Sequence, residues 1–152
     1  MNRPVTIPES RISAETVHAS TVAVDGRAIL ITGPSGSGKS DLTLRLLDRG
    51  FTLVSDDQTL VRRSGDRLIA SAPATIAGKL EIRGIGIVEM DIVKDVPVAL
   101  IVELTGEIQR LPDDSRERPI LGVTLPLISV DAMTASAPSK VALGLDRLGL
   151  KF

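Results

Sequence analysis

The octapeptide Gly-Pro-Ser-Gly-Ser-Gly-Lys-Ser at residues 33–40 constrains the fold more than any other stretch of the chain. It matches the pattern G-x-x-x-x-G-K-S, in which a glycine-rich backbone turns several N–H groups toward a polyphosphate. An apolar run at residues 28–32 predicts a buried strand before it, and residues 41–49, closed by Gly50, predict a helix after it. Because this order is the one that the motif requires, we interpret residues 33–40 as a phosphate-binding P-loop. The alternative is a glycine-rich turn with an exposed lysine.

The residue types in the P-loop predict a nucleoside triphosphate and Mg²⁺ as ligands. Lys39 can reach the β- and γ-phosphates, the Ser40 hydroxyl can coordinate Mg²⁺, and the helix N-terminus adds a favourable dipole. Phe51 and Phe152 are the only aromatic residues, so we expect ATP to be held mainly by its phosphates, with weak selectivity for the base. The predicted nucleotide-binding residues are Gly33, Pro34, Ser35, Gly36, Ser37, Gly38, Lys39 and Ser40.

Composition predicts a single cytoplasmic domain. The chain has 152 residues, a formal net charge of −1, no cysteine and no apolar run long enough to cross a membrane. It also lacks a block of basic residues, which argues against nucleic acid or a membrane surface as a partner. Residues 1–14 contain two prolines and little periodicity, so we expect a flexible lead-in there and one catalytic domain over residues 15–152.

Two segments are expected to bring polar side chains to the P-loop. Residues 16–24 are rich in Val and Thr and end at Asp25-Gly26, which predicts a strand that folds back, antiparallel, onto the P-loop strand. His18, the only histidine, lies in this strand, either as a structural residue or near the phosphates. Asp56 and Asp57 follow the β-like run 51–55 and are interpreted either as Mg²⁺-binding or base-supplying aspartates or as a solvated turn.

The rest of the chain adds strands and one charged segment of interest. Residues 78–88 predict either a buried turn carrying Glu81 and Arg83 or a bulged strand that exposes both charges. Residues 105–118 are polar and predict a mobile excursion. The other expected elements are a hairpin (58–63 with 67–71), a central strand (96–103), an edge strand or bend containing Pro126 (120–130) and a short terminal helix (140–150).

Together these residues resemble the catalytic domain of the HPr kinase/phosphorylase family, bacterial enzymes that phosphorylate a serine of HPr, a phosphocarrier of the sugar phosphotransferase system. The resemblance runs from about residue 18 to residue 140. It is carried by His18, by the P-loop, by Arg49-Gly50 followed by Val-Ser-Asp-Asp at 54–57, and by Glu-Ile-Arg-Gly-Ile-Gly-Ile at 81–87. It implies an α/β fold with a mixed, twisted sheet, similar to that of phosphoenolpyruvate carboxykinase, and assembly into a hexamer.

The resemblance also implies a role for individual residues. Asp57 matches the general base, His18 the active-site histidine and Lys39 the P-loop lysine. Ser40 and Glu81 match the Mg²⁺ ligands. Arg83 lies in the signature segment, Arg110 matches a further catalytic arginine, and residues 138–140 stand where the family has a basic segment needed for dephosphorylation.

The expected function is therefore that of a protein serine kinase that uses ATP and Mg²⁺ and acts on HPr. Many family members also remove the phosphate by phosphorolysis, with inorganic phosphate as co-substrate. Family members commonly carry a separate N-terminal domain, and this chain begins almost at the kinase domain, so we expect a kinase module reduced to its catalytic part. Two alternatives stay open: a P-loop kinase acting on another protein or small-molecule hydroxyl, and a nucleotide-sensing module without turnover.

Overall fold

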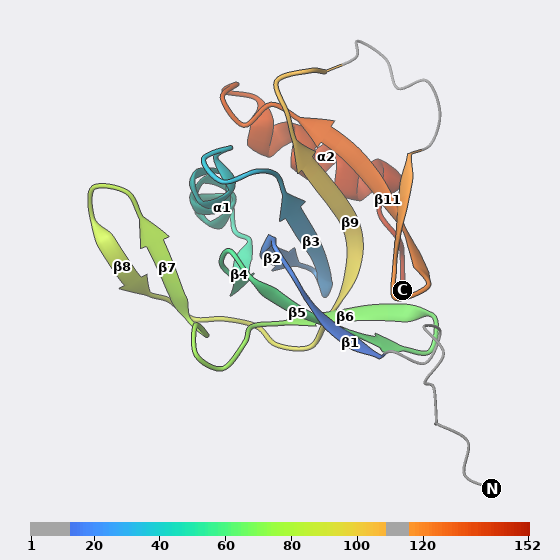
Figure 1. Ribbon diagram of the computed structural model, residues 1–152. Helices are drawn as coiled ribbons and strands as arrows, with labels where there is room; N and C mark the ends of the chain where they lie inside the picture. Colours follow the sequence, from blue (N-terminus) through green and yellow to red (C-terminus); the bar gives the residue numbers. More distant parts are fainter. Residues whose placement is uncertain (1–12, 109–115) are drawn as a thin grey trace, which may run out of the picture.

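The computed structural model describes residues 13–108 and 116–152, which form one mixed sheet, two helices and a separate hairpin (Figure 1). The predicted lead-in 1–14 lies outside the described residues except for Ser13 and Ala14, which lie beside β5. The elements are β1 (Ala14–Val17), β2 (Ser20–Val24), β3 (Arg27–Thr32), α1 (Lys39–Asp48), β4 (Thr52–Ser55), β5 (Thr59–Ser64), β6 (Arg67–Ser71), β7 (Lys79–Ile82), β8 (Gly86–Glu89), β9 (Val96–Leu104), β10 (Glu117–Ile120), β11 (Val123–Val130) and α2 (Ala137–Leu148).

The P-loop strand β3 lies inside the sheet, between β2 and β9. Strands β3, β9 and β11 run parallel, whereas β2 is antiparallel to both β3 and β4. β6 pairs antiparallel with the first two residues of β9. β5 pairs with β6, and β1 pairs with β5, so these strands extend the sheet on that side. The sheet is therefore mixed, as the predicted α/β class requires.

Two apolar cores explain why β3 is a continuous hydrophobic run. Ile29 and Ile31 pack with α1 and α2 on one face of the sheet, and Ala28 and Leu30 pack under β5 and β6 on the other. A strand covered on both faces has no exposed side on which polar residues would alternate. The P-loop therefore begins from a strand that is held on all sides. Neither of the two described helices is long and apolar enough to cross a membrane.

The first predicted strand is wrong in one respect: residues 16–24 form parts of two strands. The chain turns after Val17, where the Ala19 N–H donates to the Val17 carbonyl, so β1 pairs with β5 and β2 pairs with β3. His18 consequently lies in the bend between the strands, not within one. The predicted hairpin at Asp25-Gly26 is confirmed, with φ values of 52° and 71° that match a two-residue primed turn.

Residues 78–88 adopt neither of the two expected forms, because they make a separate antiparallel hairpin, β7–β8, which projects from the body of the domain (Figure 1). Gly84 and Gly86 have φ values of 86° and 111°, which let the chain reverse at its tip. Leu80 is fully buried, whereas Ile85 and Ile87 are 74% and 69% exposed. The two glycines thus make a turn instead of interrupting an element.

The C-terminal elements follow the prediction more closely. The central strand is β9, and α2 begins at Ala137, three residues before the predicted start, with Pro138 in its first turn. Pro126 lies where β11 exchanges neighbours, since β10 pairs with Val123–Pro126 and β9 with Leu127–Val130. The β10–β11 hairpin itself, which turns at Leu121-Gly122, had no counterpart in the sequence interpretation.

Candidate functional site

The predicted site residues gather at one edge of the sheet because of the strand directions. β3 and β4 both run antiparallel to β2, so their carboxyl ends and the beginning of β2 meet. The P-loop follows β3, Asp56 and Asp57 follow β4, and Ser20 is the first residue of β2. Ligands of open α/β sheets bind outside the carboxyl ends of the strands, which is where these residues lie.

The P-loop is closed on itself around the side chain of Lys39, the first residue of α1. Lys39 is only 6% exposed, and its Nζ donates to the carbonyls of Gly33 at 2.8 Å and Pro34 at 3.0 Å. A Cβ at Gly33 would lie 2.7 Å from Ser37 Oγ, so glycine is required there. Gly38 precedes α1 without a side-chain cap, which leaves the N–H groups of the first turn available to an anion.

Asp56 ties three elements together at the P-loop. It is 8% exposed, and its Oδ1 accepts hydrogen bonds from Ser20 Oγ at 3.0 Å and Ser40 Oγ at 2.9 Å. Its Oδ2 accepts from the backbone N–H of Glu81 at 3.3 Å. Asp56 was expected, with Asp57, either as a Mg²⁺-binding or base-supplying aspartate or in a solvated turn, and Ser20 was given no role. The sequence pattern that could have indicated this role is an acidic residue directly after a buried strand, in a chain whose P-loop carries a hydroxyl at Ser40.

Asp57 lies beside Asp56 but in a different environment. Its side chain is 63% exposed, and its Oδ1 lies 2.8 Å from His18 Nε2. The backbone of Asp57 is left-handed, with φ at 66°, and its N–H donates to Ser20 Oγ at 3.0 Å. Because of this conformation, the successive carboxylates of Asp56 and Asp57 point to different partners, Asp56 to buried hydroxyls and Asp57 to His18. The structure therefore brings together His18 and Asp57, and leaves a carboxylate accessible for proton transfer.

Glu81 and Arg83 are positioned by the hairpin. Both side chains are exposed, and only the backbone of Glu81 is hydrogen-bonded to the site, through Asp56. Arg83 is located in the turn beyond β7. Arg110 lies outside the described residues, and Lys140 is exposed on α2. The hairpin thus joins the site at its base while its charged side chains face solvent.

The residues at this edge fit Mg²⁺ bound together with phosphates. Among the residues that the structure describes, no cluster of three or more His, Cys, Asp or Glu side chains could hold a metal alone. Mg²⁺ commonly takes one or two carboxylates and completes its shell with water and phosphate oxygens. The Ser40 hydroxyl beside the P-loop and the carboxylate of Glu81, whose backbone N–H donates to Asp56, offer such a partial donor set.

A cluster of charges on β9, β10 and β11 lies on the other side of the P-loop strand. Glu103 is paired in register with Thr32, the last residue of β3. Its carboxylate accepts from Arg118 at 2.9 Å and Arg116 at 3.4 Å, and Arg116 also donates to Ser129 Oγ. The two arginines share one carboxylate, so this flank is basic where the Asp56 flank is acidic. The sequence interpretation assigned these residues no role.

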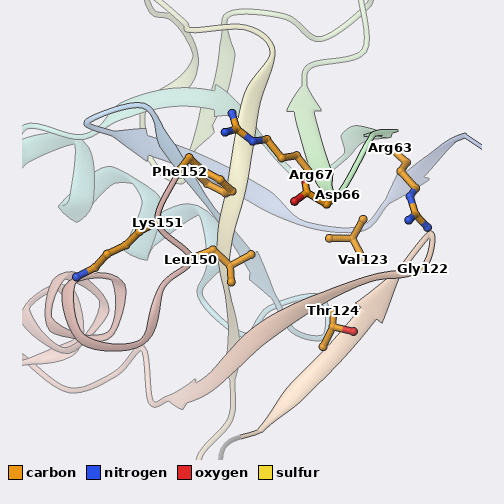
Figure 2. A pocket seen from close by; sticks show the side chains of 9 residues that line it. All are labelled: Arg63, Asp66, Arg67, Gly122, Val123, Thr124, Leu150, Lys151 and Phe152. Carbon is orange, nitrogen blue, oxygen red and sulfur yellow. The ribbon is translucent and has the colours of Figure 1, made fainter.

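Two hollows on the protein lie away from the P-loop edge of the sheet. One of them, with a volume of about 500 Å³, lies between the β5–β6 turn, the start of β11 and the last residues of the chain. Figure 2 shows the side chains that line it. The guanidinium of Arg67 lies 4.8 Å from the centre of the Phe152 ring there. A second hollow adjoins Gly26 and Pro97, at the amino ends of β3 and β9. Neither of these two hollows is lined by the P-loop, Asp56 or Asp57.

Comparison with known proteins finds similarity over most of the chain. Residues 10–142 match the family described as HPr serine kinase C-terminal domain. An HPr kinase/phosphorylase of Clostridium botulinum is 35% identical over 135 residues, which cover 81% of this chain and 43% of the relative. One from Chlorobium limicola is 38% identical over 129 residues, covering 74% and 38%. The chain thus spans about two fifths of the length of these curated relatives.

A solved structure shows the same arrangement of elements. The HPr(Ser) kinase/phosphatase from Coxiella burnetii matches 87% of this chain and 88% of its own, with 32% sequence identity and a TM-score of 0.77.

Proposed function

The chain belongs to the family of HPr serine kinase C-terminal domains, and from this premise we propose that it is the catalytic domain of an ATP- and Mg²⁺-dependent kinase that phosphorylates a serine of HPr. The observation that carries the proposal is the exposed Asp57 carboxylate, held 2.8 Å from His18 beside the P-loop. A module that only senses a nucleotide has no need of a positioned base. This pair therefore favours turnover over binding alone.

The P-loop and Lys39 bind and orient the phosphates in this proposal. When bound, MgATP supplies the phosphoryl group and a counter-charge for it. The N–H groups of the loop and of the first turn of α1 face the phosphate oxygens. Lys39 exchanges its bonds to the Gly33 and Pro34 carbonyls for bonds to the β- and γ-phosphates.

Ser40 and Glu81 would hold the Mg²⁺, as the family resemblance implies, and Asp56 orients Ser40. The Ser40 hydroxyl donates its proton to Asp56, which leaves its lone pairs for the metal. Asp56 also accepts from the Glu81 N–H, so the same carboxylate fixes the base of the hairpin that carries the second ligand. Asp56 is thus a positioning residue, because it acts through Ser40 and Glu81.

Asp57 acts as the general base for the incoming serine. Its carboxylate accepts the hydroxyl proton as the serine oxygen attacks the γ-phosphorus, and His18 holds the carboxylate in place. Arg83 or Arg110 stabilises the charge on the transferring group in this proposal. In the reverse direction an oxygen of inorganic phosphate in the P-loop attacks the phosphorus of phosphoserine and the bond from phosphorus to the serine oxygen breaks. Asp57 takes the proton from the attacking phosphate and passes it to the serine oxygen. The products are then HPr and pyrophosphate.

The proposal also includes a cellular compartment and an oligomeric state. We place the domain in the cytoplasm, where ATP and a phosphocarrier protein are available. We also propose a homo-oligomer, with the hexamer of the family as the specific expectation. Both rest on the family resemblance.

Mass spectrometry of HPr tests the proposed function. HPr is incubated with this protein, ATP and Mg²⁺, and excess inorganic phosphate is then added. A phosphoserine that appears and then disappears supports both activities, and one that persists supports a kinase without phosphorolysis. Consumption of ATP with unmodified HPr would move the assignment to another hydroxyl acceptor. Binding of ATP without any consumption would reduce the domain to a nucleotide sensor.

A further inference from the structure

The loop between β11 and α2, residues 131–136, lies against the P-loop. Ala132 in this loop is buried, and a Cβ placed on Gly38 would lie 3.1 Å from the Ala132 Cβ. Figure 1 shows the β11–α2 loop and the loop that enters α1 at the same end of the sheet. The β11–α2 loop therefore forms a wall of the phosphate site, on the side away from Asp56.

The β11–α2 loop is held in one conformation by its own hydrogen bonds and by α1. Asp131 Oδ1 accepts from the Met133 N–H at 2.9 Å, and Thr134 Oγ1 donates to the Asp131 carbonyl at 2.8 Å. Arg45 of α1 donates to the carbonyls of Thr134, at 3.2 Å, and Ala132. These bonds link the loop to the helix that carries Lys39, so the loop and the P-loop keep a fixed relation.

Met133 projects from this fixed loop into solvent. Its exposed fraction of 88% is the largest of any large hydrophobic residue that the structure describes. A single exposed apolar residue is ordinary on a protein surface. Met133, however, directly follows the residue that touches the P-loop, and its backbone is fixed by a hydrogen bond to Asp131. The loop thereby presents an apolar side chain next to the residue that contacts Gly38 of the P-loop.

Neither aromatic residue is placed to receive the base of a nucleotide held by the P-loop. Phe51 is buried in the core between the sheet and the helices, and Phe152 packs against Arg67 at the opposite end of the sheet. Near the P-loop, one flank is occupied by the acidic Asp56 and Asp57. The other flank carries the charge cluster around Glu103 and also the β11–α2 loop, which offers Met133 as an exposed apolar side chain.

We propose that Met133 is the platform on which the base of the bound nucleotide rests. The thioether is polarizable and makes favourable contacts with aromatic rings, so it can cover a purine face without stacking. A contact of this kind depends on the flat face of the base and does not involve the hydrogen-bonding groups at its edge. The site therefore accepts adenine and guanine nucleotides with similar affinity. This inference rests on the proposed function, because it assumes a nucleotide in the P-loop.

Binding measurements with and without a base test this assignment. The Kd values of ATP, GTP and tripolyphosphate, each with Mg²⁺, are measured by calorimetry for the unaltered protein, Met133→Ala and Met133→Leu. Leu148→Ala, at the far end of α2 and also exposed, is the matched control. We expect Met133→Ala to weaken ATP and GTP about three- to tenfold and to leave tripolyphosphate unchanged. Met133→Leu keeps most of the contact and stays within about twofold.

Each other outcome has a definite meaning. Unchanged ATP binding in Met133→Ala overturns the platform, and so does an equal loss for ATP and tripolyphosphate, which indicates a disturbed P-loop. A raised KM for HPr with unchanged nucleotide Kd also overturns it, because Met133 then contacts the acceptor. If the unaltered protein binds neither ATP nor tripolyphosphate, the proposed function itself fails, which separates the two failures.

Discussion

The P-loop with its anchor and the β7–β8 hairpin contribute to the same site in opposite ways. In the anchored region, comprising Ser20, the P-loop and Asp56, three side chains are buried (Ser20, Lys39 and Asp56), and Asp56 accepts hydrogen bonds from Ser20 and Ser40. The hairpin shares a single backbone hydrogen bond with that region, at Glu81, and buries Leu80 beneath it. Its tip is exposed at Ile85 and Ile87.

This difference indicates that the site combines a rigid part with a part that can move. Groups that must be in place before a phosphate arrives are fixed by buried polar contacts, which are costly to leave unpaired and therefore hold one geometry. Segments with few buried apolar contacts open at lower free energy than the core. The hairpin can thus bring Glu81 and Arg83 to the substrates while the P-loop stays still. The predictions below test this division.

Removing the lysine of the anchored region should have the largest effect. In Lys39→Ala we expect phosphoryl transfer to fall by about a hundredfold or more, because a charge-stabilising group is lost from the phosphate site. Nucleotide affinity should fall as well. Single-turnover transfer and calorimetric binding measure both effects, with Lys94→Ala, at an exposed position, as the control. Unchanged affinity for ATP would argue against the P-loop assignment.

The adjacent aspartates should differ in their effect on folding stability. Asp56→Asn places an amide where two hydroxyls and one N–H donate, so we expect the free energy of unfolding to fall by about 1–3 kcal/mol. Asp57→Asn should change it by less than about 0.5 kcal/mol, because the side chain is exposed and asparagine tolerates a left-handed backbone. Urea unfolding of the two variants gives the comparison. Equal losses would contradict the buried anchor.

The hairpin should affect metal dependence without affecting stability. In Glu81→Gln we expect the Mg²⁺ concentration for half-maximal transfer to rise about tenfold, because a proposed ligand loses its charge. Its unfolding curve should match that of the unaltered protein. Glu89→Gln, exposed in the partner strand of the same hairpin, should leave the Mg²⁺ dependence unchanged. A similar shift in both variants would indicate a general charge effect.

The smallest effect is expected at the tip of the hairpin. Ile87→Ser removes an exposed side chain, so the free energy of unfolding should stay within about 0.5 kcal/mol of the unaltered value. Thermal unfolding monitored by circular dichroism measures it. A loss above 2 kcal/mol would mean that the hairpin packs more tightly than its exposure indicates.

The sequence allowed prediction of elements with local signals. The strand, P-loop and helix were predictable from one motif, and the first two hairpins from Asp25-Gly26 and from residues 64–66. The β7–β8 hairpin was missed because residues 78–88 were expected to form a buried turn or a bulged strand, and not two paired strands reversing at Gly84 and Gly86. No local pattern indicates that β6 pairs with β9, since that contact joins distant segments.

The candidate site was predictable as a set of residues but not as a geometry. Asp57 was expected near the phosphates, and its contact with His18 follows from the bend after Val17, which no propensity indicates. The anchoring role of Asp56 depends on burial, and a pair of aspartates after a strand is equally typical of an exposed turn. The burial of Asp56 depends on the β7–β8 hairpin, which packs beside it, and this is a tertiary contact that the local sequence does not indicate.

The most direct test of the account is phosphoryl transfer to HPr by Asp57→Asn, compared with the unaltered protein. Intact HPr is analysed by mass spectrometry after incubation with ATP and Mg²⁺, and the Kd for ATP is measured on the same samples. We predict that the unaltered protein adds one phosphate to a serine, and that Asp57→Asn binds ATP normally and adds none. Near-normal transfer by Asp57→Asn would contradict the assignment of Asp57 as the base and the division of the site that follows from it.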